Sequence, residues 1–100
     1  MRTAFEIRMD YRRALNQAEE LERVARDLRR TATNDLQDCI SDISHNWTGE
    51  NSSAYIKKCN TLKTNIEKTA RKIEKTAGTI RTVAQTTYHA EMAALNLLRS

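Results

Sequence analysis

The chain has 100 residues, the length of one small domain, and 30% of them are charged while 5% are aromatic. It contains no proline and two glycines, so few turns are available, and it is rich in the residues that form long helices. No apolar run approaches the roughly 18 residues of a membrane-spanning helix, and the start lacks the apolar stretch of a secretory signal peptide. We therefore expect one all-α domain over residues 1–100 that does not use the general secretory signal.

The first half of the chain predicts one helix over about residues 3–44. Its apolar residues recur at steps of three and four, which places them on one helix face. The pattern repeats every 18 residues, or five turns, and so indicates a straight helix. A strict seven-residue repeat would have placed Asp35 and Asp42 on this face. The face consists of Ile7, Tyr11, Ala14, Ala18, Leu21, Ala25, Leu28, Ala32, Leu36, Cys39 and Ile43.

The central stretch HNWTGENSSAY predicts a turn at residues 45–49 and holds Trp47, the only tryptophan of the chain. Asn46 is expected to end the first helix, because asparagine tolerates left-handed backbone geometry. Thr48 is a candidate N-cap for the next helix, and Gly49 lets the chain reverse with a positive φ. An exposed indole here is either a plug for the end of the hairpin or a binding hot spot.

The second half predicts a helix over about residues 50–96, which a short turn forces to run antiparallel to the first. Glu91 is the one charged residue on its apolar face. That interruption is explained if this end of the helix protrudes beyond its neighbours. The face consists of Tyr55, Cys59, Leu62, Ile66, Ala70, Ile73, Ala77, Ile80, Ala84, Tyr88, Leu95 and Leu98.

Cys39 and Cys59 lie equally far from residue 49, so a hairpin folded about that point brings them to the same level. A disulfide across the hairpin is possible where the two Cα atoms come within about 7 Å. The alternative is a pair of small buried thiols, and the sequence leaves both open. No metal site is expected, because two thiols without a nearby histidine fall short of four ligands.

Further apolar residues flank both faces and widen them beyond what one neighbouring helix covers. A two-helix hairpin also buries too little surface to be secure alone. We therefore expect two hairpins to pair as a four-helix bundle, in a homodimer or a heterodimer. The flanking residues are Leu15, Val24 and Ile40 in the first helix, and Ile56, Val83 and Leu97 in the second.

The sequence resembles the WXG family, the ESAT-like helical-hairpin proteins of type VII secretion in Gram-positive bacteria. The resemblance covers the whole chain and rests on its length, the central Trp47-Thr48-Gly49, the flanking long helices and the missing signal peptide. It implies a dimeric, non-enzymatic protein that is cytoplasmic before a membrane ATPase exports it, as a substrate or as the escort of a larger LXG-type toxin. The family's export signal is Tyr-x-x-x-Asp/Glu; Tyr88 and Glu91 are its degenerate counterpart here, with the acid three positions on.

The sequence offers less support for an enzyme, a nucleic-acid-binding protein or a membrane-active hairpin. No phosphate-binding loop or catalytic motif is present, so we expect neither enzymatic activity nor a cofactor. Residues 47–100 carry a net charge of +5, which makes a nucleic-acid-binding helical dimer the alternative function. However, the cations occupy several helix faces and no base-reading motif accompanies them. A membrane-active hairpin is less well supported, because no bulky aromatic residues line the faces.

Overall fold

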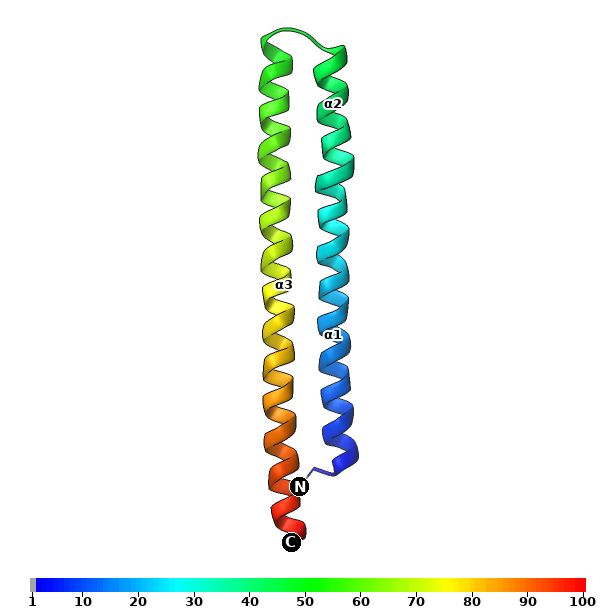
Figure 1. The fold of residues 1–100 in the computed structure, drawn as a ribbon, viewed down its shortest axis with the longest axis vertical. Helices are drawn as coiled ribbons and strands as arrows, with labels where there is room; N and C mark the ends of the chain where they lie inside the picture. Colours follow the sequence, from blue (N-terminus) through cyan, green and yellow to red (C-terminus); the bar gives the residue numbers. More distant parts are fainter. Residues whose placement is uncertain (1) are drawn as a thin grey trace. The chain divides into compact units, whose positions relative to one another are not determined.

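A computed structural model describes residues 2–100, which contain helices and no strand. The elements are α1 (Ala4–Arg30), a π-helical segment η1 (Thr31–Leu36), α2 (Gln37–Asn46) and α3 (Glu50–Arg99) (Figure 1). The predicted all-α fold is confirmed, and the break falls at the centre of the chain. The first predicted helix is not uniform, because six of its residues form η1.

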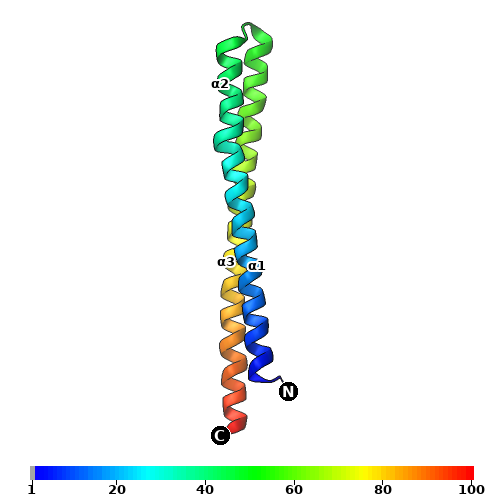
Figure 2. The same cartoon turned by 90° about the vertical axis from the view of Figure 1, so that its right-hand side faces the viewer.

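The chain divides into two compact units. One contains the described residues up to Glu22 together with Glu74–Ser100, and the other is Arg23–Ile73. Within each unit, a segment from the first half of the chain lies beside an antiparallel segment of α3 (Figures 1 and 2). Each unit is therefore a two-helix pair, as a hairpin requires. Pairing with a second chain stays a prediction.

Small residues form the contact between the helices. Five alanines have no exposed surface, and no large side chain among the described residues is completely buried. Alanine lets two helices approach closely but hides little apolar area. The core is therefore thin, and several large apolar side chains remain outside it. The completely buried alanines are Ala18, Ala25, Ala32, Ala70 and Ala77.

The inner face of α1 follows a seven-residue repeat from Ile7 to Ala32, with alternating steps of four and three. Continued unchanged, that repeat would turn Asp35 and Asp42 inward. Instead η1 takes up one extra residue, because a π-turn holds more residues than an α-turn. The inner positions after it are Leu36, Ile40 and Ile43. The 18-residue pattern therefore holds at Leu36 and Ile43 but not at Cys39, and the departure from the seven-residue repeat is concentrated in η1.

A side chain marks the start of η1. The Thr31 hydroxyl donates a hydrogen bond to the Asp27 carbonyl oxygen at 3.2 Å. In a regular α-helix, the backbone N–H of Thr31 uses this acceptor, so the two donors compete for it. At the other end, the backbone N–H of Gln37 bonds the Asn34 carbonyl oxygen.

The inner face of α3 also differs from the prediction over its first turns. Tyr55 and Leu62 are about half exposed, at 52% and 50%, whereas Ser52 is buried and Ile56 half-buried. The inner positions of α3 recur every seven residues, and this spacing leaves Tyr55 and Leu62 outside the contact between the helices. The Lys63 ammonium reaches across the pair to donate to Gln37 Oε1 at 3.0 Å. Leu98, also predicted on the face, is 71% exposed.

Candidate functional site

The central turn consists of Trp47, Thr48 and Gly49, which is shorter than the predicted 45–49 because α2 continues through His45 to Asn46. The last turn of α2 closes with the Trp47 N–H bonded to the Ile43 carbonyl oxygen at 2.9 Å, and Trp47 is extended. Among the described residues only Gly49 has a positive φ, of 100°, so the left-handed geometry expected at Asn46 was wrong. The Gly49 carbonyl accepts the Ser53 N–H at 3.3 Å, which makes Gly49 rather than Thr48 the N-cap of α3.

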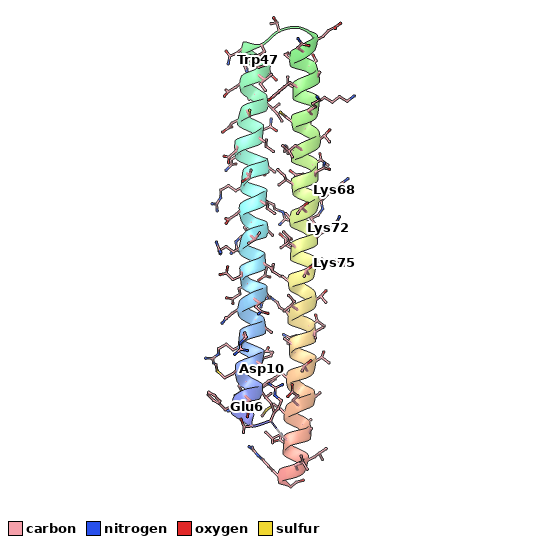
Figure 3. The ribbon with its side chains drawn as sticks, turned by 180° about the vertical axis from the view of Figure 1, so that it is seen from behind. Glu6, Asp10, Trp47, Lys68, Lys72 and Lys75 are labelled. Atoms are coloured by element: carbon pink, nitrogen blue, oxygen red, sulfur yellow. The ribbon has the colours of Figure 1, made fainter. Side chains whose placement is uncertain are left out.

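Trp47 forms an aromatic pair with Tyr55 beside this turn. Their ring centroids are 5.9 Å apart, and the two side chains are 54% and 52% exposed. Figure 3 places Trp47 at the turn. The indole is thus held on one side by Tyr55 and is open to solvent on the other, as a residue that contacts a partner would be. Sequence analysis missed Tyr55 as part of this surface because it assigned Tyr55 to the helix contact.

Tyr88 lies in the other unit and forms a second aromatic pair, with Tyr11 of α1. The ring centroids are 4.7 Å apart and both residues are half-buried. His89 contacts the edge of the Tyr88 ring at 5.5 Å. Tyr88 is therefore held against α1. The sequence signal for this contact was available, because Tyr11 and Tyr88 both occupy the predicted inner faces.

Glu91 is also bound within its unit. Its Oε1 accepts a hydrogen bond from Arg2 Nη1 at 3.2 Å, and its side chain is only 26% exposed. Arg2 also pairs with Asp10 and donates to the Glu6 carbonyl oxygen at 3.3 Å. The protruding end proposed to explain Glu91 was therefore wrong, because the segment before α1 covers this part of α3. Figure 3 shows Glu6 and Asp10 at the start of α1.

A capping box fixes this end of α1. The Thr3 hydroxyl accepts the Glu6 N–H at 3.1 Å, while the Glu6 carboxylate accepts the Thr3 N–H at 3.4 Å. The spacing Thr-x-x-Glu is a sequence signal for such a start, and sequence analysis did not use it. The cap holds the backbone beside Arg2, whose guanidinium binds Glu91.

An open groove of ≈ 380 Å³ lies between α1 and α3 in this unit, which we call the Tyr88 groove. Its walls are mainly apolar, and the small residues Ala14 and Ala84 give it depth. Val83 stands on its edge and is 57% exposed. The Arg2–Glu91 contact lies at one end. The lining residues are Arg2, Ile7, Asp10, Tyr11, Ala14, Thr79, Ile80, Val83, Ala84, Thr87, Tyr88 and Glu91.

An ion pair joins the same two helices. Arg81 Nη2 lies 2.5 Å from Glu22 Oε1, and each side chain is 35% exposed. The hydrogen bond to Glu22 raises the pKa of Arg81 above its ordinary value, with further contributions from the charges of Glu22 and Glu19. Arg81 therefore stays charged throughout the physiological pH range. Neither Arg81 nor Glu22 lines the groove.

We expect Tyr11 and Tyr88 to stabilise the unit jointly. In a double-mutant cycle with Tyr11→Leu and Tyr88→Leu, the coupling free energy should be about 0.5–1.5 kcal/mol, as for other aromatic pairs. Urea unfolding of the four proteins followed by circular dichroism measures it. The same cycle with Phe5→Leu and Tyr88→Leu is the control, because no ring contact between Phe5 and Tyr88 is present. Strictly additive effects for Tyr11 and Tyr88 would contradict a stabilising ring contact.

The cysteines are both free thiols. Cys39 is exposed and Cys59 half-buried, so the predicted position of Cys39 on the inner face was wrong. Ile40 occupies the inner position instead, because η1 shifts the register by one residue. Residues 2–100 contain no group of three side chains able to hold a metal ion.

The basic residues of α3 are spread along the helix, from Lys57 and Lys58 next to Tyr55 to Arg99 at its end. Lys68 and Lys72 are exposed on the middle of the helix (Figure 3).

None of the helices in the described part of the chain is long and apolar enough to cross a membrane.

The chain matches the sequence profile of a known protein family. The sequence profile described as the PPE family matches residues 11–98, which include η1, the turn and most of the residues that line the Tyr88 groove. No curated protein and no solved structure matches the chain.

Proposed function

The chain belongs to the PPE family, a helical family linked to type VII secretion, and from this premise we propose a specific role for it. It is a small non-enzymatic protein that is exported as a dimer or acts as the targeting partner of a larger secreted toxin. It is cytoplasmic before export and leaves by the type VII route. The WXG resemblance of Trp47-Thr48-Gly49 belongs to this proposal.

The Tyr88 groove is the observation that carries the proposal. PPE proteins pair with other helical proteins in type VII secretion, so a chain of this family needs a surface that receives a helix. The groove supplies an apolar channel between two helices, with Val83 exposed on its edge. A partner helix that inserts a side chain between Ala14 and Ala84 would add the core volume that the alanine contact lacks.

The two aromatic pairs have different roles in this proposal. Tyr88 and Glu91 are held against α1 by Tyr11 and Arg2, so they shape the groove for the partner. Trp47 and Tyr55 stay about half exposed and are available to the secretion ATPase after the partner has bound. In this proposal the secretion machinery recognises Tyr88 and Glu91, the degenerate export signal, together with the partner helix bound in the groove.

The test is a pull-down of the tagged chain from its own host, followed by mass spectrometry. We expect a helical partner, either a second copy or a related chain, together with a secretion ATPase or an LXG-type toxin. Val83→Glu should reduce recovery of the helical partner at least tenfold, because it places a charge on the edge of the apolar groove. Gln85→Glu adds the same charge at an exposed position of α3 outside the groove and should leave recovery unchanged.

Two results would contradict the proposal. One is recovery of nucleic acid instead of secretion components, with a salt-dependent shift of DNA on a gel, which would favour the alternative function. The other is equal partner recovery with Val83→Glu and Gln85→Glu, which would place the partner elsewhere.

A further inference from the structure

Most of the lysines and arginines that α3 contributes to the unit Arg23–Ile73 lie on one face of the helix. In the seven-residue spacing of α3, Lys63 occupies an inner position and binds Gln37 across the pair. The other five cations occupy the positions of this repeat that lie farthest from the helix contact, and all five are exposed. We call them the basic face: Lys57, Lys58, Lys68, Arg71 and Lys72.

The spacing of these residues makes the basic face narrow and straight. Residues that are two repeats apart lie in one column along the helix, as Lys57 and Arg71 do. Lys58 and Lys72 form a second column, and Lys68 lies between the two. The face extends over roughly 22 Å, at the helical rise of about 1.5 Å per residue. Figure 3 shows Lys68 and Lys72 on the side of α3 that is turned away from the neighbouring helix.

No acidic or large apolar residue interrupts the basic face. The outer positions between Lys57 and Lys72 that are not basic hold the exposed residues Thr61, Thr64 and Asn65. Their hydroxyl and amide groups are hydrogen-bond donors for phosphate oxygens. A protein interface requires apolar anchors, and a helix that inserts into a bilayer requires an apolar side, so the face provides for neither. It is suited to a layer of anionic groups.

The other helical segment of this unit carries the opposite charge. No lysine or arginine occurs between Arg30 and Lys57, and Asp35, Asp38 and Asp42 are exposed there. An anionic surface attracts the basic face and repels these carboxylates. Such a surface would therefore hold the unit in one orientation, with α3 nearest to it.

We propose that the basic face binds the headgroups of an anionic phospholipid bilayer, with α3 lying flat on the surface and α2 facing away from it. Each lysine or arginine near such a surface adds a similar electrostatic attraction, so the binding depends on several of them together. The helix does not insert, since no apolar residue of the face is available to enter the acyl chains. This membrane contact goes beyond the secretory role proposed above.

The shape of the surface distinguishes a bilayer from nucleic acid, which also presents rows of phosphates. The major groove of a duplex surrounds a bound helix, so phosphates lie on both flanks of that helix. Glu67 lies on one flank of the basic face, next to the inner residue Ile66, and its carboxylate would meet those phosphates. A flat bilayer contacts only the outer positions and leaves Glu67 beside the helix contact, where it is half-buried.

Vesicle binding by the purified full chain tests the proposal. Vesicles of equal parts phosphatidylglycerol and phosphatidylcholine should sediment with the chain, whereas vesicles of phosphatidylcholine alone should not. Raising the ionic strength from about 0.1 M to about 1 M should release the chain, because the screening length falls from roughly 10 Å to roughly 3 Å. The proposal is overturned by no binding to the anionic vesicles, by equal binding to both kinds, or by binding that survives high salt.

Matched variants test whether the basic face makes the contact. Lys68→Gln combined with Lys72→Gln should weaken binding to the anionic vesicles at least tenfold. Arg12→Gln combined with Arg13→Gln is the control, because it removes the same charge from exposed positions of α1, where acidic and basic residues alternate. All four positions are exposed, so circular dichroism should show intact helices in both variants. Equal losses would show that net charge alone governs binding and would rule out the basic face as the contact.

Duplex DNA at the same phosphate concentration serves as the competitor. It should leave most of the chain on the anionic vesicles, and transfer of the chain to the DNA would assign the basic face to nucleic acid instead. Partner recovery and export do not enter these measurements, so this inference and the proposed function fail separately.

Discussion

Replacing Ala25 with glutamate should unfold the protein. Ala25 has no exposed surface, so the new carboxylate would lie between two closely packed helices without water. An unpaired buried charge costs about 3–5 kcal/mol, a large part of the roughly 5–15 kcal/mol that stabilises a typical domain. The carboxylate is also longer than the alanine contact permits. Far-UV circular dichroism and urea unfolding measure the loss.

Val24→Glu is the matched control for this prediction. It makes the same change of charge one residue earlier, but Val24 is 40% exposed and its side chain reaches water. Its cost should stay near about 0.5 kcal/mol, as at other surface positions. Similar effects at residues 24 and 25 would show that Ala25 does not lie between the helices in solution.

Trp47→Ala should leave the helices intact and reduce export at least tenfold. Trp47 lies in the turn between α2 and α3 and is 54% exposed, so little of the core depends on it. In the proposed function its indole binds the secretion machinery, and loss of a hot-spot aromatic costs about 2 kcal/mol or more, which exceeds a tenfold change. Quantitative immunoblots of medium and cell fractions measure export.

Phe5→Ala provides the control for Trp47. Phe5 is also an exposed aromatic residue, at 69%, but it lies in the first turn of α1 and outside both aromatic pairs. Its replacement should leave export unchanged. If Trp47→Ala is exported normally, the turn is not a recognition surface. If both variants lose export equally, export depends on exposed aromatic side chains in general and not on the turn.

Much of the fold could be predicted because periodicity and turn residues act locally. The spacing of the apolar residues predicts the inner face from Ile7 to Ala32. The turn-forming residues at the centre of the chain predict the reversal at Gly49. The inner positions after Ala32 could not be predicted, because Cys39 and Ile40 are adjacent apolar residues and either one fits the spacing between Leu36 and Ile43. Only the packing against α3 decides between them, and it selects Ile40.

The site was less accessible to sequence analysis for a related reason. Trp47, Gly49, Tyr88 and Glu91 were identified, yet their surroundings depend on which residues lie across the helix pair. Arg2 could not be identified as the partner of Glu91, because its position depends on the capping box formed by Thr3 and Glu6. The Tyr88 groove is deep because the small residues Ala14 and Ala84, from two different helices, line it together. The pattern of one helix alone does not show which residues lie opposite each other.

The alanine contact has a consequence for how an isolated copy melts. Unfolding would expose little apolar area that was hidden before, so the change in heat capacity and the sensitivity to urea should both be low for a chain of this length. Heating would then give a broad transition with a gentle slope. A second chain seated in the groove would steepen that transition and raise its midpoint as the protein concentration increases.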